Sequence, residues 1–185
     1  MLEELRNDPS EYVRRSVANN LNDISKDHPD QVIALCKRWK KGASPEREWI
    51  IRHATRTLVK ASHPDVFGLL GYTENPDLDL LSLKVAPAKI QLGESIEFNA
   101  SLKSTGKTKQ QVIVDYVVHH MKANGQTSPK VFKLKALTIA PGETVELTKR
   151  HAIKPISTRK YYPGEHAIGF MVNGKTLDLC NFQLD

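Results

Sequence analysis

The sequence predicts a multidomain chain in which an all-α part is followed by an all-β part. Three observations support this fold class. Apolar residues recur at helical spacing up to about residue 76, a pattern repeats within that stretch, and beyond Asn75-Pro76-Asp77 the spacing changes to that of short strands. The 185 residues, 39% of them hydrophobic, suffice for two small cores. We therefore divide the chain into residues 1–76 and 79–185.

Apolar spacing and start signals predict the helices of the first part. Asp8-Pro9-Ser10 is a start signal for a helix over residues 10–27, because Ser or Asp can cap the first turn. One face of that helix is apolar, with residues at steps of four, four and three: Val13, Val17, Leu21 and Ile24. Three more helices are expected, each entered through Pro, Ser or Asp: about 29–40, 47–61 and 64–70.

The helical part contains an internal repeat. Glu11-Tyr12-Val13-Arg14-Arg15 aligns with Glu48-Trp49-Ile50-Ile51-Arg52 at an offset of 37 residues, and His28-Pro29-Asp30 aligns with His63-Pro64-Asp65 at an offset of 35. A long helix and a shorter one repeating at about this length are typical of HEAT-like solenoids. Because about three or more repeats are normally needed for stability, we expect further repeats to belong before Met1.

The second part reads as short strands separated by turns. Turn signals such as Asn124-Gly125 and Asn173-Gly174 stand between segments rich in Val, Ile, Leu and Phe. Seven or eight strands in about 105 residues predict an immunoglobulin-like β-sandwich, without the Cys–Trp–Cys pattern of antibody domains. The expected strands are 82–86, 95–102, 112–121, 131–139, 144–151, 166–173 and 176–184.

The excess positive charge lies entirely in the second part. Residues 1–78 hold 12 Lys and Arg against 12 Asp and Glu, whereas residues 79–185 hold 15 against 9. A basic domain favours a polyanionic partner such as nucleic acid, although a solvated lysine surface explains the charge equally well. No apolar run could span a membrane, and the two cysteines have no disulfide or metal spacing. We expect a cytoplasmic monomer with no membrane contact, cofactor or metal.

Polar residues of the first helix form a stripe beside its apolar face. Arg15, Asn19 and Asp23 lie at i, i+4 and i+8. A curved surface of stacked repeats with such cations could follow a phosphate backbone, or the stripe could be an ordinary solvated face with its arginines paired to nearby acids. The offset of 37 gives three cations as the counterparts: Arg52, Arg56 and Lys60.

Asp23 is the residue of the stripe that a binding role does not explain. A carboxylate among phosphate-binding cations weakens binding, but it would stabilise the positive charge that develops on deoxyribose when an N-glycosidic bond breaks. The alternatives are an ion pair with Lys60 or a cap on a neighbouring backbone. Trp49, aligned with Tyr12, could stack on a base or a sugar, or pack between repeats.

Residues 8–30 and 49–60 resemble the C-terminal HEAT-like repeats of AlkC-type DNA alkylation repair glycosylases. The resemblance covers about residues 2–71, and its most specific run is Val17-Ala18-Asn19-Asn20-Leu21-Asn22-Asp23. Members of that family remove N3-methylated purines from DNA without the usual base flipping. Some carry an immunoglobulin-like domain after the repeats that helps to encircle DNA, and the basic second part looks like that domain.

The resemblance implies that this chain is the DNA-binding C-terminal part of a hydrolase that excises 3-methyladenine from duplex DNA. It implies that Asp23 is a catalytic carboxylate facing the damaged nucleotide. The family's other acidic site residues lie on earlier repeats, so we expect a fragment or a truncated member. A non-catalytic DNA-binding module and a protein-interaction scaffold remain alternatives. The residues predicted to bind alkylated double-stranded DNA are Arg15, Asn19, Trp49, Arg52, Arg56 and Lys60.

Overall fold

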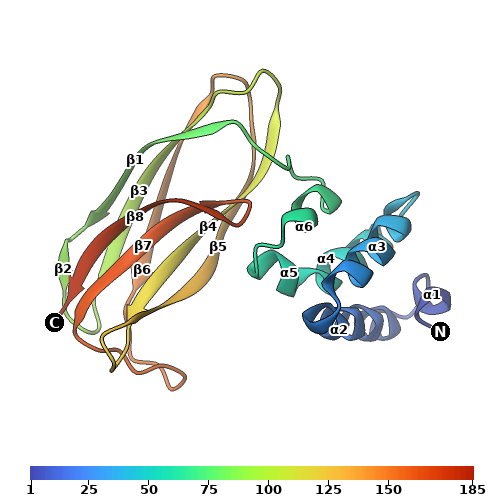
Figure 1. The fold of residues 1–185 in the computed structure, drawn as a ribbon, viewed down its shortest axis with the longest axis horizontal. Coiled ribbons are helices and arrows are strands. Elements are labelled where there is room, and N and C mark those ends of the chain that lie inside the picture. Colours follow the sequence, from blue (N-terminus) through green and yellow to red (C-terminus); the bar gives the residue numbers. More distant parts are fainter. The chain divides into compact units, whose positions relative to one another are not determined.

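The computed structural model describes residues 1–185, which divide into two compact units, Met1–Glu74 and Asn75–Asp185 (Figure 1). Strands account for 41% of the residues and helices for 29%. The predicted fold class, all-α HEAT-like repeats followed by a sandwich, is therefore wrong. The chain is mostly β, with two sheets and only six short helices. None of these helices is long and apolar enough to cross a membrane.

The first unit is built from six helices, and three of them begin with Pro at a position where its missing N–H leaves no hydrogen bond unmade. Its core holds Trp39, whose side chain is 1% exposed and whose indole N–H donates to Glu3 at 2.7 Å. The helices are α1 (Leu2–Leu5), α2 (Glu11–Asp27), α3 (Pro29–Lys40), α4 (Pro45–Ala54), α5 (Arg56–Lys60) and α6 (Pro64–Leu69).

The predicted helix over residues 47–61 is two helices, because the backbone breaks at Thr55. The hydroxyl of Thr55 donates to the carbonyl of Ile51 at 2.8 Å, a local bond that competes with helical geometry. The buried side chain of Asn22, on α2, accepts a hydrogen bond from the backbone N–H of Thr57 at 3.2 Å. A side chain of one helix therefore caps the start of another. This break is one reason why the helical unit consists of short, unequal pieces and not of two matching repeats.

Removing the cap should destabilise the helical unit. Asn22→Ala leaves the partly buried N–H of Thr57 without its side-chain acceptor, and we expect it to lower the free energy of unfolding by about 1–2 kcal/mol. Urea denaturation followed by tryptophan fluorescence measures the effect, because Trp39 and Trp49 both lie in this unit. Asn20→Ala, an exposed neighbour on α2, is the control. If the two variants had the same free energy of unfolding, Asn22 would not stabilise the unit as a cap.

The second unit contains a three-stranded sheet of order β1-β3-β6 and a five-stranded sheet of order β2-β8-β7-β4-β5 (Figure 1). All seven predicted strands are present, and β2 was missed. The strands are β1 (Leu78–Ala86), β2 (Lys89–Ile90), β3 (Ser95–Ser104), β4 (Gln110–Met121), β5 (Thr127–Ile139), β6 (Thr144–Ala152), β7 (Gly164–Val172) and β8 (Lys175–Leu184).

The core of this unit lies between the two sheets. Phe98 of β3 and Tyr116 of β4 come from different sheets, and their rings lie 5.1 Å apart. Alternate residues of β3 are buried, as expected for a strand with one face on a core. Two-residue β2 pairs in parallel with the end of β8, and the N–H of Asp185 donates to the carbonyl of Ile90 at 3.0 Å. The second unit is thus a β-sandwich.

Candidate nucleic-acid interface

The predicted site residues of the helical unit come from α2, α4 and α5, which pack together. Most of their side chains are exposed, and Arg56 is half-buried. We call this set, with His53 added, the α2–α4–α5 surface. It consists of Arg15, Asn19, Asp23, Trp49, Arg52, His53, Arg56 and Lys60.

The amide oxygen of Asn19 joins three helices. Asn19 lies on α2, and its Oδ1 accepts a hydrogen bond from Nη1 of Arg56, on α5, at 3.1 Å. The same oxygen lies 3.0 Å from Nε2 of His53, on α4. Nη1 of Arg56 also donates to the backbone carbonyl of His53 at 3.2 Å. Asn19 and Arg56 are counterparts at the offset of 37, and in the structure they are hydrogen-bonded neighbours.

Asp23 presents an ionised carboxylate to solvent. Its side chain is 70% exposed, and its Oδ1 accepts from the ammonium of Lys26, one turn further along α2, at 2.7 Å. That hydrogen bond and the charge of Lys26 lower the pKa of Asp23, and the charge of Arg56 adds to the effect. The alternative that Asp23 pairs with Lys60 is wrong, because its ionic partner is Lys26.

Trp49 is held by a ring contact and keeps an exposed surface. Its ring stacks on that of His53, with centroids 4.8 Å apart and planes 10° from parallel, and the side chain remains 38% exposed. Burial lowers the pKa of His53, and the charges of Arg56 and Arg15 lower it further. The lowered pKa favours the neutral imidazole, and in that form the stack is between two uncharged rings.

The cations of this surface differ in their partners. Arg15 pairs with Glu11 at 2.7 Å, as the solvated-face alternative expects, and both side chains are more than half exposed. Arg52, Arg56 and Lys60 have no carboxylate oxygen within 4.0 Å, so three cations remain available to an external anion. An exposed ion pair such as Arg15–Glu11 contributes little stability, and a phosphate could displace it.

Sequence reasoning missed His53 and Lys26. His53 follows Trp49 by four residues and precedes Arg56 by three, a spacing that places all three on one helical face and could have singled it out. Lys26 lies three residues after Asp23 on the same helix, which is also a contact spacing. The ion-pair alternative considered only the repeat counterpart of Asp23, Lys60.

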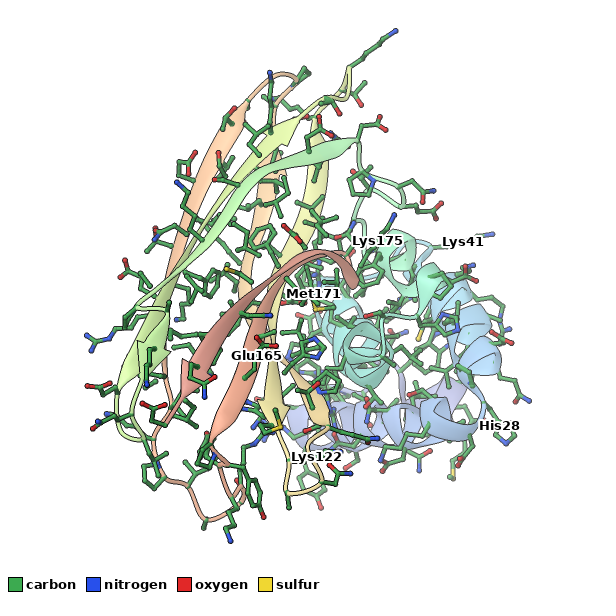
Figure 2. The ribbon with its side chains drawn as sticks, turned by 60° about the vertical axis from the view of Figure 1, so that its left-hand side comes forward. His28, Lys41, Lys122, Glu165, Met171 and Lys175 are labelled. Atoms are coloured by element: carbon green, nitrogen blue, oxygen red, sulfur yellow. The ribbon has the colours of Figure 1, made fainter.

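A second group of cations lies on the sandwich. Strands β5 and β6 are edge strands of their two sheets and contact each other. Lys122 and Lys175 lie at opposite ends of the β4-β7-β8 part of the sheet (Figure 2). The exposed cations on β5 and β6 are Lys130, Lys133, Lys135, Lys149 and Arg150.

His151 lies among these cations and turns toward the sandwich core. Its Nδ1 is 3.1 Å from the hydroxyl of Tyr116. Burial lowers the pKa of His151 to about 4, and the charges of Lys130 on β5 and Lys149 on β6 contribute. His166 of β7, also buried, has a pKa lowered mainly by burial. Two histidines of the sandwich are thus held in the neutral form.

These histidines should make the sandwich sensitive to acid. The pKa of His151 is about 4 in the folded state and about 6.5 in the unfolded state. Above about pH 6.5 the ring is neutral in both states, and the free energy of unfolding does not depend on it. As the pH falls from 6.5 toward 4, the unfolded state binds a proton that the folded state does not, so the free energy of unfolding decreases. With screening of the partly exposed ring, we expect a loss of about 1–2 kcal/mol over that range. Urea denaturation of the full chain, followed through amide NMR signals of the sandwich, measures it.

His151→Gln should flatten this pH dependence, whereas His119→Gln should not, because His119 on β4 lies outside the ring contacts that connect His151, His120 and His166. If the free energy of unfolding of His151→Gln depended on pH as it does in the unmodified chain, His151 would not be the source of the acid sensitivity.

The two units combine a small helical domain that carries exposed cations with an immunoglobulin-like sandwich. Residues 79–185 match the family model described as "Uncharacterised protein YhaZ, C-terminal Ig-like domain". The match covers more than half of the chain, and the chain belongs to this family. It is 40% identical over 184 residues to "Uncharacterized protein YhaZ" of Bacillus subtilis (strain 168), with 100% of this chain and 51% of that protein covered.

Among solved structures, the chain is similar to the Pseudomonas fluorescens alkylpurine DNA glycosylase AlkC bound to DNA containing an abasic site analog. The TM-score is 0.94 at 40% identity, and the match covers 100% of this chain and 51% of AlkC. The chain therefore spans about half the length of both relatives. A β-glucosidase from Erythrobacter marinus, at 16% identity and a TM-score of 0.50 over 60% of this chain, is similar in fold alone.

Proposed function

We propose that the chain acts in DNA alkylation repair, as the DNA-binding part of a glycosylase that excises N3-methylated purines such as 3-methyladenine from duplex DNA. The observation that carries the proposal is 40% identity over the whole chain to a glycosylase whose structure was solved with DNA containing an abasic site analog. Removal of a base leaves an abasic site. The exposed anion and the unpaired cations of the α2–α4–α5 surface support the same chemistry.

In this proposal Asp23 stabilises the charge that forms on the sugar. A purine methylated at N3 carries a positive charge and departs as a neutral base, so the bond can break without a strong general acid. The positive charge then passes to the deoxyribose, where a fixed carboxylate stabilises it before water attacks. Lys26 must yield its place to the sugar, and an exposed pair of this kind is weak enough to open.

The exposure of Asp23 fits a reaction on a base that remains in the duplex. With 70% of its side chain exposed, the carboxylate can face a deoxyribose at the DNA surface, and no base has to be extruded into a pocket. Arg52, Arg56 and Lys60 would bind phosphates on either side of the lesion. The cations on β5 and β6 would add phosphate contacts from the sandwich.

The experiment that tests the proposal is release of free 3-methyladenine from alkylated duplex DNA by the full chain, with binding to the same DNA measured in parallel. Release with binding supports the glycosylase. Binding without release overturns catalysis by this chain alone and leaves a non-catalytic DNA-binding module. Neither binding nor release overturns the proposal as a whole and favours the protein-interaction scaffold.

A further inference from the structure

We propose that Asn19 is a positioning residue that fixes both the guanidinium of Arg56 beside Asp23 and the imidazole on which Trp49 stacks. The proposal rests on the proposed function, because it concerns how the α2–α4–α5 surface is prepared for DNA. It assigns to Asn19 a role through other residues and not a contact with the reacting sugar.

The hydrogen bonds determine which way the amide of Asn19 faces. A guanidinium carries only donors, so the amide atom that meets Nη1 of Arg56 at 3.1 Å must be the oxygen. The same oxygen lies 3.0 Å from Nε2 of His53, so this ring nitrogen must carry the hydrogen. Arg56 therefore selects, through Asn19, the Nε2–H tautomer of His53, and Nδ1 keeps the lone pair.

The tautomer and the ring orientation of His53 in turn hold Trp49. The two rings are nearly parallel, so a rotation of the imidazole would remove the surface on which the indole rests. Trp49 also lines a shallow pocket together with Glu11, Arg14, Pro45 and Glu46, at the edge of the α2–α4–α5 surface. A fixed indole at this place can stack on a sugar or a base with little loss of side-chain freedom.

The same oxygen holds the guanidinium of Arg56 near Asp23, and the two groups do not pair. Nη1 of Arg56 is occupied by Asn19 and by the carbonyl of His53, and Asp23 pairs with Lys26. Arg56 is close enough for its charge to act on Asp23, yet the two groups form no ion pair. One amide oxygen thus holds a phosphate-binding cation next to the carboxylate while leaving that carboxylate accessible to a sugar.

The first test reads the His53 tautomer by long-range ¹H–¹⁵N NMR of the histidine rings in the full chain, with the signal assigned through His53→Gln. We expect the Nε2–H form in the unmodified protein and a mixture of tautomers in Asn19→Ala. In Asn19→Asp, Nε2 should carry a hydrogen again, because the carboxylate accepts from it, and the negative charge should also favour the doubly protonated ring. Asn20→Ala, an exposed neighbour without such contacts, should match the unmodified protein. An unchanged tautomer in Asn19→Ala would overturn the proposal.

The second test measures duplex DNA affinity by fluorescence anisotropy. Asn19→Ala should weaken binding by about tenfold, the usual order for losing a hydrogen bond to a charged group, and should have a clearly smaller effect when Arg56→Ala is already present, because only the contact with His53 then remains to be lost. Additive effects of the two substitutions would overturn the positioning role. If the unmodified chain binds no duplex DNA, the proposed function fails, whereas the NMR test still decides whether Asn19 controls His53.

Discussion

Replacing Asp23 by Asn should lower the single-turnover rate of 3-methyladenine release by about 10²–10³-fold, the usual cost of removing one group that stabilises transition-state charge. The substitution keeps the size of the side chain and removes only its negative charge. Affinity for undamaged duplex DNA should stay the same or rise slightly, because an anion that repels phosphates has been removed. A lower rate with undiminished affinity separates a catalytic carboxylate from a merely structural one.

Asp27→Asn is the matched control for this experiment. Asp27 is the last residue of α2, is exposed like Asp23, and has no cation within ion-pair distance. We expect this variant to release 3-methyladenine at the rate of the unmodified chain. A rate for Asp23→Asn within about threefold of the unmodified chain would remove the proposed role of the carboxylate, since the expected loss is far larger.

Duplex DNA affinity should fall steeply with salt. If the chain contacts about six phosphates, its affinity should drop by about 10³-fold between 50 and 200 mM salt, because each contact releases a condensed counterion. Arg52→Gln should reduce the slope of log affinity against log salt by about 0.9, the value for one phosphate contact. Fluorescence anisotropy on an undamaged duplex over a range of salt concentrations measures both quantities.

Lys41→Gln is the control for the salt experiment. Lys41 follows α3, is exposed, and is not one of the residues of the α2–α4–α5 surface. Its neutralisation removes the same unit of charge and should leave the slope unchanged. A slope near zero for the unmodified chain would mean that binding is not made through phosphates and would favour the protein-interaction scaffold.

The sandwich was more predictable from sequence than the helical unit, for a physical reason. Strands of a sandwich alternate buried and exposed residues, so β3 is recognisable from its own residues, whereas two-residue β2 is too short to show any period. The break at Thr55 could not be predicted, because apolar spacing continues through residues 47–61. It depends on the hydrogen bond that the Thr55 hydroxyl donates to the carbonyl of Ile51. It also depends on Asn22, which accepts from the N–H of Thr57, 35 residues further along the chain.

The repeat alignment predicted some contacts of the candidate site and not others. It placed Asn19 opposite Arg56, and these two are hydrogen-bonded. It also placed Asp23 opposite Lys60, but a flexible lysine on the same helix is a nearer partner. The alignment indicates which positions face each other. Which side chains form hydrogen bonds or ion pairs depends on their length and on whether another partner lies closer on the same helix.

The bond between Asn22 and the first turn of α5 bears on how the chain can meet a ligand. Because the short helix that carries Arg56 and Lys60 is attached to the interior of α2, it should not fray independently of its longer neighbour. Its cations are thus held in a preorganised array before any partner arrives. Most of the loss of conformational freedom occurs during folding, so association is opposed by a smaller entropy change than it would be for a loose basic loop.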